Sequence, residues 1–392
     1  MRCYISFLSK MVLKGIDKEK PVVLCVGRSL FKKDYKQFSQ DKTFAWIWVD
    51  TYMLKLALDD IVPSEYQHQT QYIDSLELHK EEWRSAINLM SKFLEKIKKR
   101  VAVNSVLTAN IDYWQDYALK KAAQDQSVKV VVLSKEFPIN KKVSEEYRRK
   151  YYKFEHLADY ICCFGSRLQD IFIDSGLGNK NNIVVTGAPR LDAWRSAQYI
   201  QSGNIVTLLS FREGYGGDSE IFFYDVMERT IKALEIKSEK YVLYIKAKNK
   251  IDEKLIKEEV GESKNVIVTS SVELTDLLPR SKIIIGFNSL SLVEALLTES
   301  VILVPDWHGL DKKEDMLSTF SFVPPGTINL VTKEKLSKLL ENIESTVDEL
   351  APIRENRLSM LKEFMQWDDD ETSTEKLVKI LKKEGLKDKE IC

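Results

Sequence analysis

Residues 283–297, IIIGFNSLSLVEALL, run from a fully apolar strand pattern directly into an apolar helix pattern. Asn288 or Ser289 stands between the two, where either side chain can accept a hydrogen bond from the first-turn N–H groups of a helix. A buried strand that passes at once into a helix is typical of a parallel sheet covered by helices. This stretch therefore predicts an α/β fold.

The same alternation of strand and helix patterns recurs along most of the chain. The expected strands of the first half are 21–26, 45–49, 106–109, 130–133, 160–164 and 183–186, and those of the second half are 205–210, 241–246, 266–269, 283–287 and 301–304. Residues 78–100 form the clearest helix pattern, since Trp83, Ile87, Met90, Leu94 and Ile97 recur at three- and four-residue steps. We expect two successive α/β halves.

Chain length supports a division at the middle. A chain of 392 residues exceeds the roughly 250–300 residues at which a single core stops growing. The polar stretch 195–203 separates a turn from a new apolar strand, so we interpret it as a linker. The sequence predicts a first domain over 1–200, a second over 201–366 and a C-terminal helical segment over 367–392.

Composition excludes several classes of function. The 59 Lys and Arg residues balance the 59 Asp and Glu residues, whereas nucleic-acid binders carry a basic excess. Five cysteines and four histidines show neither disulfide nor metal-ligand spacing, so we expect no metal and no cofactor. No stretch approaches the roughly 20 apolar residues of a membrane span. We expect a cytoplasmic protein whose membrane contact, if any, is peripheral.

Ligands of parallel sheets bind outside the carboxyl ends of the strands, so residues that directly follow a strand are the candidates. In 286–297, Asn288, Ser289 and Ser291 can form an anion site with the helix N-terminus, and Glu294 can accept a hydrogen bond from a ribose hydroxyl. The alternative is a capped core helix without a ligand. Both interpretations stay open on the residues alone.

Two further strand ends of the second half carry candidates. Residues 211–219, FREGYGGDS, contain three glycines that permit close backbone approach, and Arg212 can bind a phosphate with paired donors. Asp218 is either a catalytic carboxylate or the N-cap of the helix that follows. Lys246 and Lys248 end the next strand, where they can contact a donor or simply be solvated.

Strand ends of the first half suggest a base and contacts to sugar. Glu136 follows the strand 130–133 beside apolar residues that would raise its pKa, which suits a general base. The alternative for Glu136 is a surface pair with Lys135. Asn110 and Tyr113 are suited to sugar hydroxyls, and Arg28 ends the first strand.

Arg190 lies in the turn that closes the first half. The sequence Gly187-Ala188-Pro189 fixes that turn, which holds Arg190 at a defined position near the predicted hinge. Arg190 is thus a candidate residue for the acceptor or the cleft. The alternative is a structural pair between Arg190 and Asp192.

Four of these segments together resemble bacterial surface-polysaccharide glycosyltransferases of the GT-B type. They are TANIDYW at 108–114, VLSKE at 132–136, VTGAPRLD at 185–192 and GFNSLSLVEAL at 286–296. The broader group includes the glycerophosphotransferases of teichoic acid and the capsular and O-antigen transferases. Lys-Glu after a first-domain strand looks most like the β-Kdo transferases. The resemblance implies two Rossmann-like domains facing across a cleft, with C-terminal helices crossing back to the N-terminal domain.

The resemblance also implies roles for the candidate residues. Asn288, Ser289 and Ser291 would hold the donor phosphate, Glu294 would lie near the ribose, and the lysines at 246 and 248 would contact the donor. Where many relatives carry His-Pro or Lys-Pro-His after that strand, this chain has Lys246-Ala247-Lys248-Asn249. The identities of the nucleotide and of the sugar therefore stay open.

The predicted activity is transfer of a sugar, Kdo from CMP-Kdo, to a lipid-linked or oligosaccharide acceptor. Asp218 is the predicted nucleophile or ion-stabilising group, and Glu136 is the predicted acid/base. If Asp218 forms a glycosyl-enzyme, the anomeric configuration of the sugar is retained. If Glu136 only activates the acceptor, the configuration is inverted. The alternatives are a CDP-glycerol-type glycerophosphotransferase, a UDP-sugar epimerase and an inactive nucleotide-binding scaffold. No nucleic acid is expected as a partner.

Overall fold

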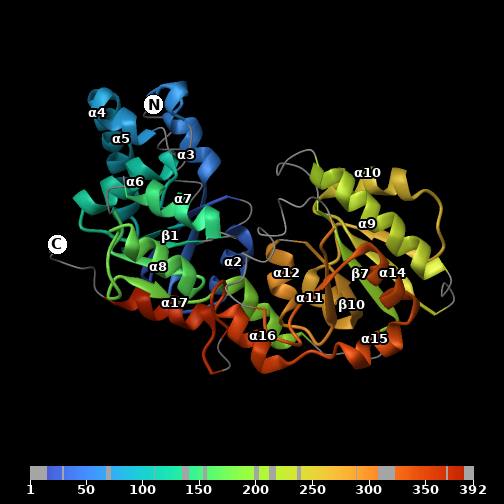
Figure 1. Cartoon of the computed structure of the whole chain (residues 1–392). Coiled ribbons are helices and arrows are strands. Elements are labelled where there is room, and N and C mark those ends of the chain that lie inside the picture. Colours follow the sequence, from blue (N-terminus) through green and yellow to red (C-terminus); the bar gives the residue numbers. More distant parts are fainter. Residues whose placement is uncertain are drawn as a thin grey trace. The chain divides into compact units, whose positions relative to one another are not determined.

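A computed structural model provides the structure of the protein. It describes residues 16–28, 31–67, 72–109, 111–134, 141–152, 157–197, 203–211, 218–235, 240–287, 289–307, 323–367 and 370–383. The chain divides into two compact units, drawn in Figure 1. The first combines Met1–Pro138, Lys142–Asp192 and Glu363–Cys392, and the second combines Ile139–Lys141 and Ala193–Lys362.

The first unit contains a six-stranded parallel sheet in the order β2-β1-β3-β4-β5-β6. Its strands are β1 (Val22–Gly27), β2 (Ala45–Asp50), β3 (Val103–Thr108), β4 (Lys129–Leu133), β5 (Tyr160–Cys163) and β6 (Ile183–Val185). Each of them overlaps a strand predicted from the sequence. All six residues of β1 are buried, as expected for a strand covered on both faces.

Helices cover this sheet. They are α2 (Phe31–Phe38), α3 (Thr51–Leu58), α4 (Tyr72–Leu78), α5 (Lys80–Lys98), α6 (Trp114–Asp125), α7 (Lys141–Tyr151), α8 (Ser166–Asp174) and, from the end of the chain, α17 (Ser373–Lys382). Helix α5 confirms the predicted amphipathic pattern, with Trp83, Met90, Leu94 and Ile97 buried. Ile87 is only half-buried, because Ala86 and Leu89 share the buried face instead.

The second unit contains another six-stranded parallel sheet, in the order β12-β11-β10-β7-β8-β9. Its strands are β7 (Ile205–Leu209), β8 (Val242–Lys246), β9 (Val266–Thr269), β10 (Ser281–Ile285), β11 (Val301–Pro305) and β12 (Asn329–Val331). The five predicted strands are present. The sequence pattern missed β12, because three residues that begin with Asn form no apolar run.

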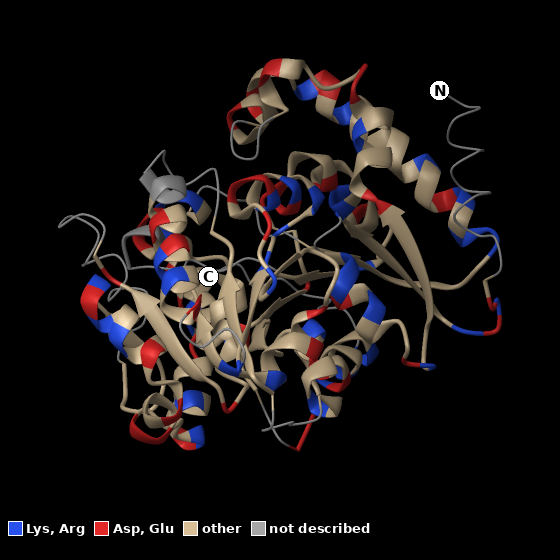
Figure 2. Cartoon of the chain, turned by 90° about the vertical axis from the view of Figure 1, so that its right-hand side faces the viewer, with Lys and Arg blue, Asp and Glu red and all other residues tan. Residues whose placement is uncertain are grey.

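The helices of the second unit are α9 (Asp218–Glu235), α10 (Lys250–Val260), α11 (Leu274–Leu277), α12 (Leu290–Ala295), α14 (Lys333–Glu341), α15 (Ile343–Glu349) and α16 (Arg354–Leu361). Figure 2 shows the charged residues mainly on helices and loops, whereas the strands are largely without them. All residues of β7 and β11 are buried. Charged side chains therefore lie mainly outside the strands.

Helix α17 belongs to the first unit although it comes last in the chain, and it packs against α2 (Figure 1). The carboxylate of Asp192 accepts hydrogen bonds from the backbone N–H groups of Ser373 and Thr374, each at 2.9 Å. At the other end, Lys129 Nζ donates to the carbonyls of Leu381 at 2.6 Å and Lys383 at 2.5 Å. An anion at the N-terminus and a cation at the C-terminus both complement the helix dipole.

Residues of the motif VTGAPRLD make structural contacts of this kind. Gly187 has φ of +78°, and a Cβ there would lie 2.5 Å from Ser373 Oγ and 2.6 Å from the carbonyl oxygen of Gln366. Among the described residues, Arg190 pairs with Asp34 and not with Asp192, which corrects that alternative. Its Nε lies 3.1 Å from both carboxylate oxygens of Asp34, and its Nη2 lies 2.5 Å from Oδ2. With Asp34 fully buried, this pair fixes α2 to the motif.

Loss of either polar contact should loosen α17 within the folded first unit. Asp192→Ala removes the acceptor for two helix N–H groups, which costs about 1 kcal/mol and should speed amide exchange in the first turn about fivefold. Lys129→Met should speed exchange in the last turn. Hydrogen exchange read by mass spectrometry measures both. Lys379→Ala, whose side chain is 70% exposed on the same helix, is the control and should change neither end. Uniform exchange in all variants would contradict the role assigned to the two contacts.

Candidate functional site

The strand order identifies one topological switch point in each sheet. In the second unit the chain proceeds from β7 to β8 and β9 on one side and then crosses to β10, β11 and β12 on the other. The order thus reverses between β7 and β10. In the first unit it reverses between β1 and β3. Ligands of open α/β sheets bind outside the carboxyl ends of the strands at such points.

At the switch point of the second sheet, the residues after β7 and β10 are in contact. The rings of Phe211 and Phe287 stack with their centroids 5.2 Å apart and an interplanar angle of 19°. Gly286 precedes Phe287, and a Cβ there would lie 2.7 Å from Leu292 Cδ1 and 3.3 Å from Leu209 Cδ1. Glycine at this position therefore lets α12 pack close to the strand ends. The direct passage from strand to helix that the pattern of 283–297 predicted is present as β10 and α12.

Ser289 is the N-cap of α12, and its Oγ accepts the N–H of Leu292 at 3.4 Å. This contact fits the capped-helix interpretation, while the hydroxyl hydrogen of Ser289 stays available for a ligand. Ser291 and Glu294 follow on α12 and are half-buried. Asn288 lies outside the described residues.

The loop that follows β7 lies mostly outside the described part of the chain. Arg212 is among those residues, and so are the glycines of 214–217. Asp218 is the first residue of α9, directly after that loop, so its backbone lies at the start of the helix that leaves the switch point. In the first unit, Glu136 and Asn110 also fall outside the described residues.

A row of aromatic rings extends from the switch point toward β11. Phe222 of α9 packs edge-on against Phe287 at 5.6 Å and against Trp307 at 5.4 Å. We call Phe211, Phe287, Phe222 and Trp307 the aromatic row. All except Phe287 are partly exposed, so the row can stack with a flat ligand. Sequence reasoning missed Trp307, although this residue lies shortly after β11 and candidates were sought at the strand ends.

Asp225 of α9 holds Trp307 in place. Its Oδ2 accepts the indole N–H of Trp307 at 2.8 Å and lies 3.1 Å from Lys333 Nζ, and its Oδ1 accepts from Arg229 Nε at 2.8 Å. Partial burial acts to raise the pKa of Asp225, but the hydrogen bonds from Trp307, Lys333 and Arg229 outweigh burial and lower it. The ionised carboxylate therefore stabilises this end of the row.

Removing the charge of Asp225 should give a pH-dependent loss of stability. Since folding lowers this pKa, ionised Asp225 stabilises the fold above its unfolded-chain value of about 4, and the contribution is lost as the pH falls through the folded-state value. Asp225→Asn should melt below wild type at pH 7, and the difference should shrink below about pH 4. Thermal denaturation from pH 7 to pH 3 measures this. Asp348→Asn, at an exposed position of α15, is the control and should follow wild type. A constant difference for Asp225→Asn would argue against an electrostatic origin.

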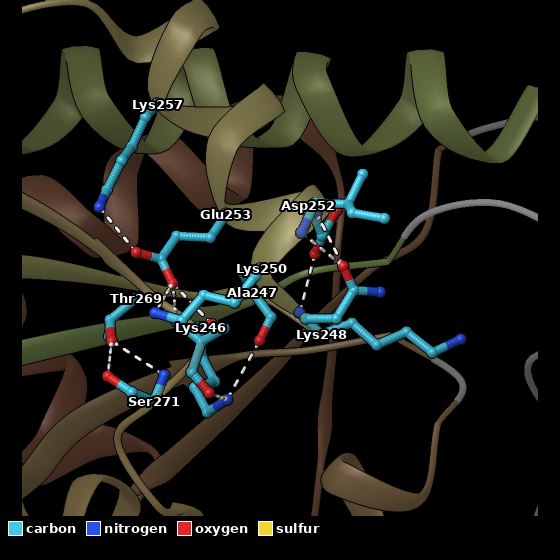
Figure 3. A network of polar contacts seen from close by, with 12 residues as sticks. Lys246, Ala247, Lys248, Lys250, Asp252, Glu253, Lys257, Thr269 and Ser271 are labelled. Carbon is cyan, nitrogen blue, oxygen red and sulfur yellow. Dashed lines mark hydrogen bonds and ion pairs between the residues drawn. The ribbon is translucent and has the colours of Figure 1, made fainter.

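The two lysines at the end of β8 differ in their surroundings (Figure 3). Lys246 is half-buried, and its Nζ donates to the carbonyls of Ala247 at 3.0 Å and Ser270 at 2.9 Å. Lys248 is exposed, and among the described residues its ammonium has no partner. Lys246 thus links the ends of β8 and β9, whereas Lys248 has an ammonium available to an anion.

At the switch point of the first sheet, the structure brings together two predicted acceptor contacts. The guanidinium of Arg28, after β1, lies over the ring of Tyr113, which precedes α6, with 4.5 Å from Cζ to the ring centroid. Tyr113 is 3% exposed, whereas Arg28 is exposed. The cation therefore rests on a fixed aromatic surface. Arg190 contributes its guanidinium to Asp34 instead, as described above.

The turn before α6 is held by charges that sequence reasoning missed. Lys150 of α7 forms an ion pair with Asp112, and Lys120 of α6 donates to the carbonyl of Ile111 at 2.7 Å. Burial lowers the pKa of Lys120, and the nearby carboxylates of Asp112 and Asp116 oppose that shift. Lys120 lies within a helix rather than after a strand, so the search of strand ends excluded it.

The described ranges contain neither a candidate metal-binding group nor a membrane-spanning helix. In those ranges no group of three or more His, Cys, Asp or Glu side chains is arranged to hold a metal ion. None of the helices described there is long and apolar enough to cross a membrane.

Comparison with known proteins identifies the fold. No protein-family model matches the sequence, and no curated protein does. Among solved structures, a variant of the wall teichoic acid polymerase TagF is 14% identical, with 97% of this chain and 93% of that chain covered at a TM-score of 0.55. UDP-GlcNAc 2-epimerase from Methanocaldococcus jannaschii is 14% identical, with 92% and 99% covered at 0.52. The S. aureus MnaA structure with UDP is 14% identical, with 92% and 95% covered at 0.50. The chain thus has the GT-B fold, with one parallel six-stranded sheet in each unit.

Proposed function

We propose that the protein is a nucleotide-sugar-dependent glycosyltransferase of surface-polysaccharide synthesis. The observation that carries the proposal is the switch point between β7 and β10, where the aromatic row and the exposed Lys248 follow adjacent strands of a GT-B fold. Flat rings suit a nucleobase, and an exposed ammonium suits a phosphate. The solved structures of this fold include one bound to UDP and one of a polymerase of wall teichoic acid.

The dimensions of the strand ends fit a nucleotide. Strands lie about 4.8 Å apart, so the ends of β8 and β11, three steps apart, are separated by roughly 14 Å. That span accommodates a base on the aromatic row and a phosphate near Lys248. Ser289 and Ser291, at the start of α12 between them, add hydroxyl donors to the phosphate.

In this proposal the site stabilises the departing phosphate. Lys248 and the serine hydroxyls supply positive charge and hydrogen bonds where negative charge develops as the sugar leaves. Asp218 is the proposed nucleophile or ion-stabilising carboxylate, because it begins α9 directly after the β7 loop. Glu136 is the proposed base for the acceptor hydroxyl, and Arg28 with Tyr113 the proposed acceptor surface. The acceptor is a lipid-linked or oligosaccharide glycan.

The identity of the donor separates the alternatives. The resemblance of the first-half motifs favours CMP-Kdo, the polymerase suggests a CDP-glycerol-type reaction, and the UDP complex suggests a UDP-sugar. Epimerisation of a UDP-sugar is the second candidate, because the likeness to the epimerase covers 99% of that chain. An epimerase converts its sugar without releasing the nucleotide, whereas a transferase releases it when an acceptor is present.

A thermal-shift panel with CMP, CDP, UDP and GDP tests the proposal. A nucleotide at 100 times its Kd adds about 2.7 kcal/mol, which should raise Tm by roughly 5–10 °C. CMP as the strongest ligand would support Kdo transfer, CDP the glycerophosphotransferase and UDP a UDP-sugar enzyme. We expect the shift to persist in EDTA, since the proposed contacts need no metal. A panel in which no nucleotide shifts Tm would overturn the proposed function.

Lys248 should contribute to nucleotide binding through its ammonium. Lys248→Ala is expected to weaken binding of the strongest nucleotide of the panel about tenfold, the equivalent of one charge-assisted hydrogen bond. Isothermal titration calorimetry measures the Kd. Lys254→Ala is the matched control, because this lysine is 77% exposed on α10 and pairs with Glu258 at 3.7 Å. Equal Kd values for wild type and Lys248→Ala would remove Lys248 from the site.

A further inference from the structure

The first turn of α10 presents two adjacent buried carboxylates, Asp252 and Glu253, which are 6% and 9% exposed (Figure 3). Asn249 is the N-cap of this helix, and its Oδ1 accepts the N–H groups of Ile251 and Asp252, each at 2.9 Å. The cap fixes the direction in which the two carboxylates leave the helix. Asp252 then contacts the ends of β7 and β8, and Glu253 contacts the end of β9.

Asp252 joins the ends of β7 and β8. Its Oδ2 accepts the hydroxyl of Ser210 at 2.7 Å and the backbone N–H of Lys248 at 2.8 Å. Ser210 N also donates to the carbonyl of Lys246 at 3.0 Å. One carboxylate oxygen therefore holds the residue before Phe211 and the backbone of the exposed lysine in a fixed relation.

Glu253 makes the corresponding contacts at the end of β9. Its carboxylate accepts the N–H of Ser270 at 2.9 Å and the hydroxyl of Ser270 at 2.6 Å. It also pairs with Lys257 at 2.7 Å and Lys250 at 3.1 Å. Strand β9 is at the edge of the sheet, two strands from β7 and three from β10. Glu253 thus has the same kind of contacts as Asp252, but farther from the switch point.

We propose that Asp252 is a positioning residue for the nucleotide at the switch point. It acts through Ser210, which precedes Phe211 of the aromatic row, and through the backbone of Lys248, whose ammonium meets the phosphate. This inference rests on the proposed function. Without Asp252, the Ser210 hydroxyl and the Lys248 N–H lose their common acceptor, and neither strand end is held in the geometry that the nucleotide needs.

The geometry distinguishes the loss of the acceptor from the loss of the charge. The hydrogen bonds from the Ser210 hydroxyl and from the Lys248 backbone N–H both end on Oδ2 of Asp252, so the one amide oxygen of asparagine can accept both. Asp252→Asn therefore retains the bridge, while Asp252→Ala removes it. If Asp252 positions the nucleotide, the asparagine variant should bind nucleotide with a Kd close to that of wild type, and the alanine variant should bind it more weakly.

The test measures Kd for CMP, CDP, UDP and GDP by calorimetry, together with Tm, in wild type and five variants. We expect Asp252→Ala to weaken binding of the nucleotide that wild type prefers at least tenfold and Asp252→Asn to stay within about threefold. Ser210→Ala should weaken binding, and combining it with Asp252→Ala should add little, because both remove the same contact. Glu253→Ala, the matched control, should lower Tm with less than a twofold change in Kd.

Each outcome bears on one of the two proposals. If wild type binds none of the four nucleotides, the proposed function fails and this inference fails with it. If wild type binds and Glu253→Ala weakens binding as much as Asp252→Ala, Asp252 has only a structural role. The same conclusion follows if Asp252→Asn is as weak as Asp252→Ala. If Asp252→Ala does not fold, Ser210→Ala decides, and unchanged binding in that variant overturns the inference.

Discussion

Parallel strands in both sheets are buried on both faces, and this burial determines where side chains can meet a ligand. All residues of β1, β4, β7 and β11 are buried, so within these strands no side chain is available to a ligand. Chemistry is thereby confined to the edge of the sheet, where the strands end and helices begin. Among all these strand ends, the strand order then identifies the switch point, which is the neighbouring pair of strands at which the order along the sheet reverses.

The same constraint explains where the charged side chains act. A helix that leaves a strand end exposes backbone N–H groups at its start and carbonyls at its end, and both need partners. Asp192 and Lys129 satisfy the two ends of α17, and Arg357 donates to the carbonyls of Thr298 at 2.5 Å and Ser300 at 2.8 Å after α12. Lys129 and Arg357 are buried and Asp192 is half-buried, and all three side chains are engaged by backbone groups, so these charges are structural. The exposed ammonium of Lys248 is different, and exposure is what distinguishes it from Lys246.

The sequence predicts strands well because burial leaves a local signature, and it predicts long-range polar pairs poorly because they leave none. Eleven of the strands coincide with apolar runs, whereas β12 is too short to form one. The search of strand ends named Arg28, Tyr113 and Ser289, and these residues follow β1, β3 and β10 in the structure. It could not find the pairing of Arg190 with Asp34, 156 residues away, or of Ser210 with Asp252, 42 residues away. Such pairs require the strand order, which local periodicity does not encode.

The segment Lys246-Ala247-Lys248-Asn249 combines, at one strand end, residues that hold the fold together and a residue that is available to a ligand. Lys246 is the last residue of β8, Asn249 caps α10, and only two residues lie between them. Ala247 is buried and its N–H donates to the carbonyl of Thr269 at 2.9 Å, so the backbone is still held by β9. Lys248 is then the one residue of the four whose side chain faces solvent without a structural partner in the described chain. Because its own N–H is bound by Asp252, this free ammonium extends from a fixed backbone, which lowers the conformational entropy that binding an anion must overcome.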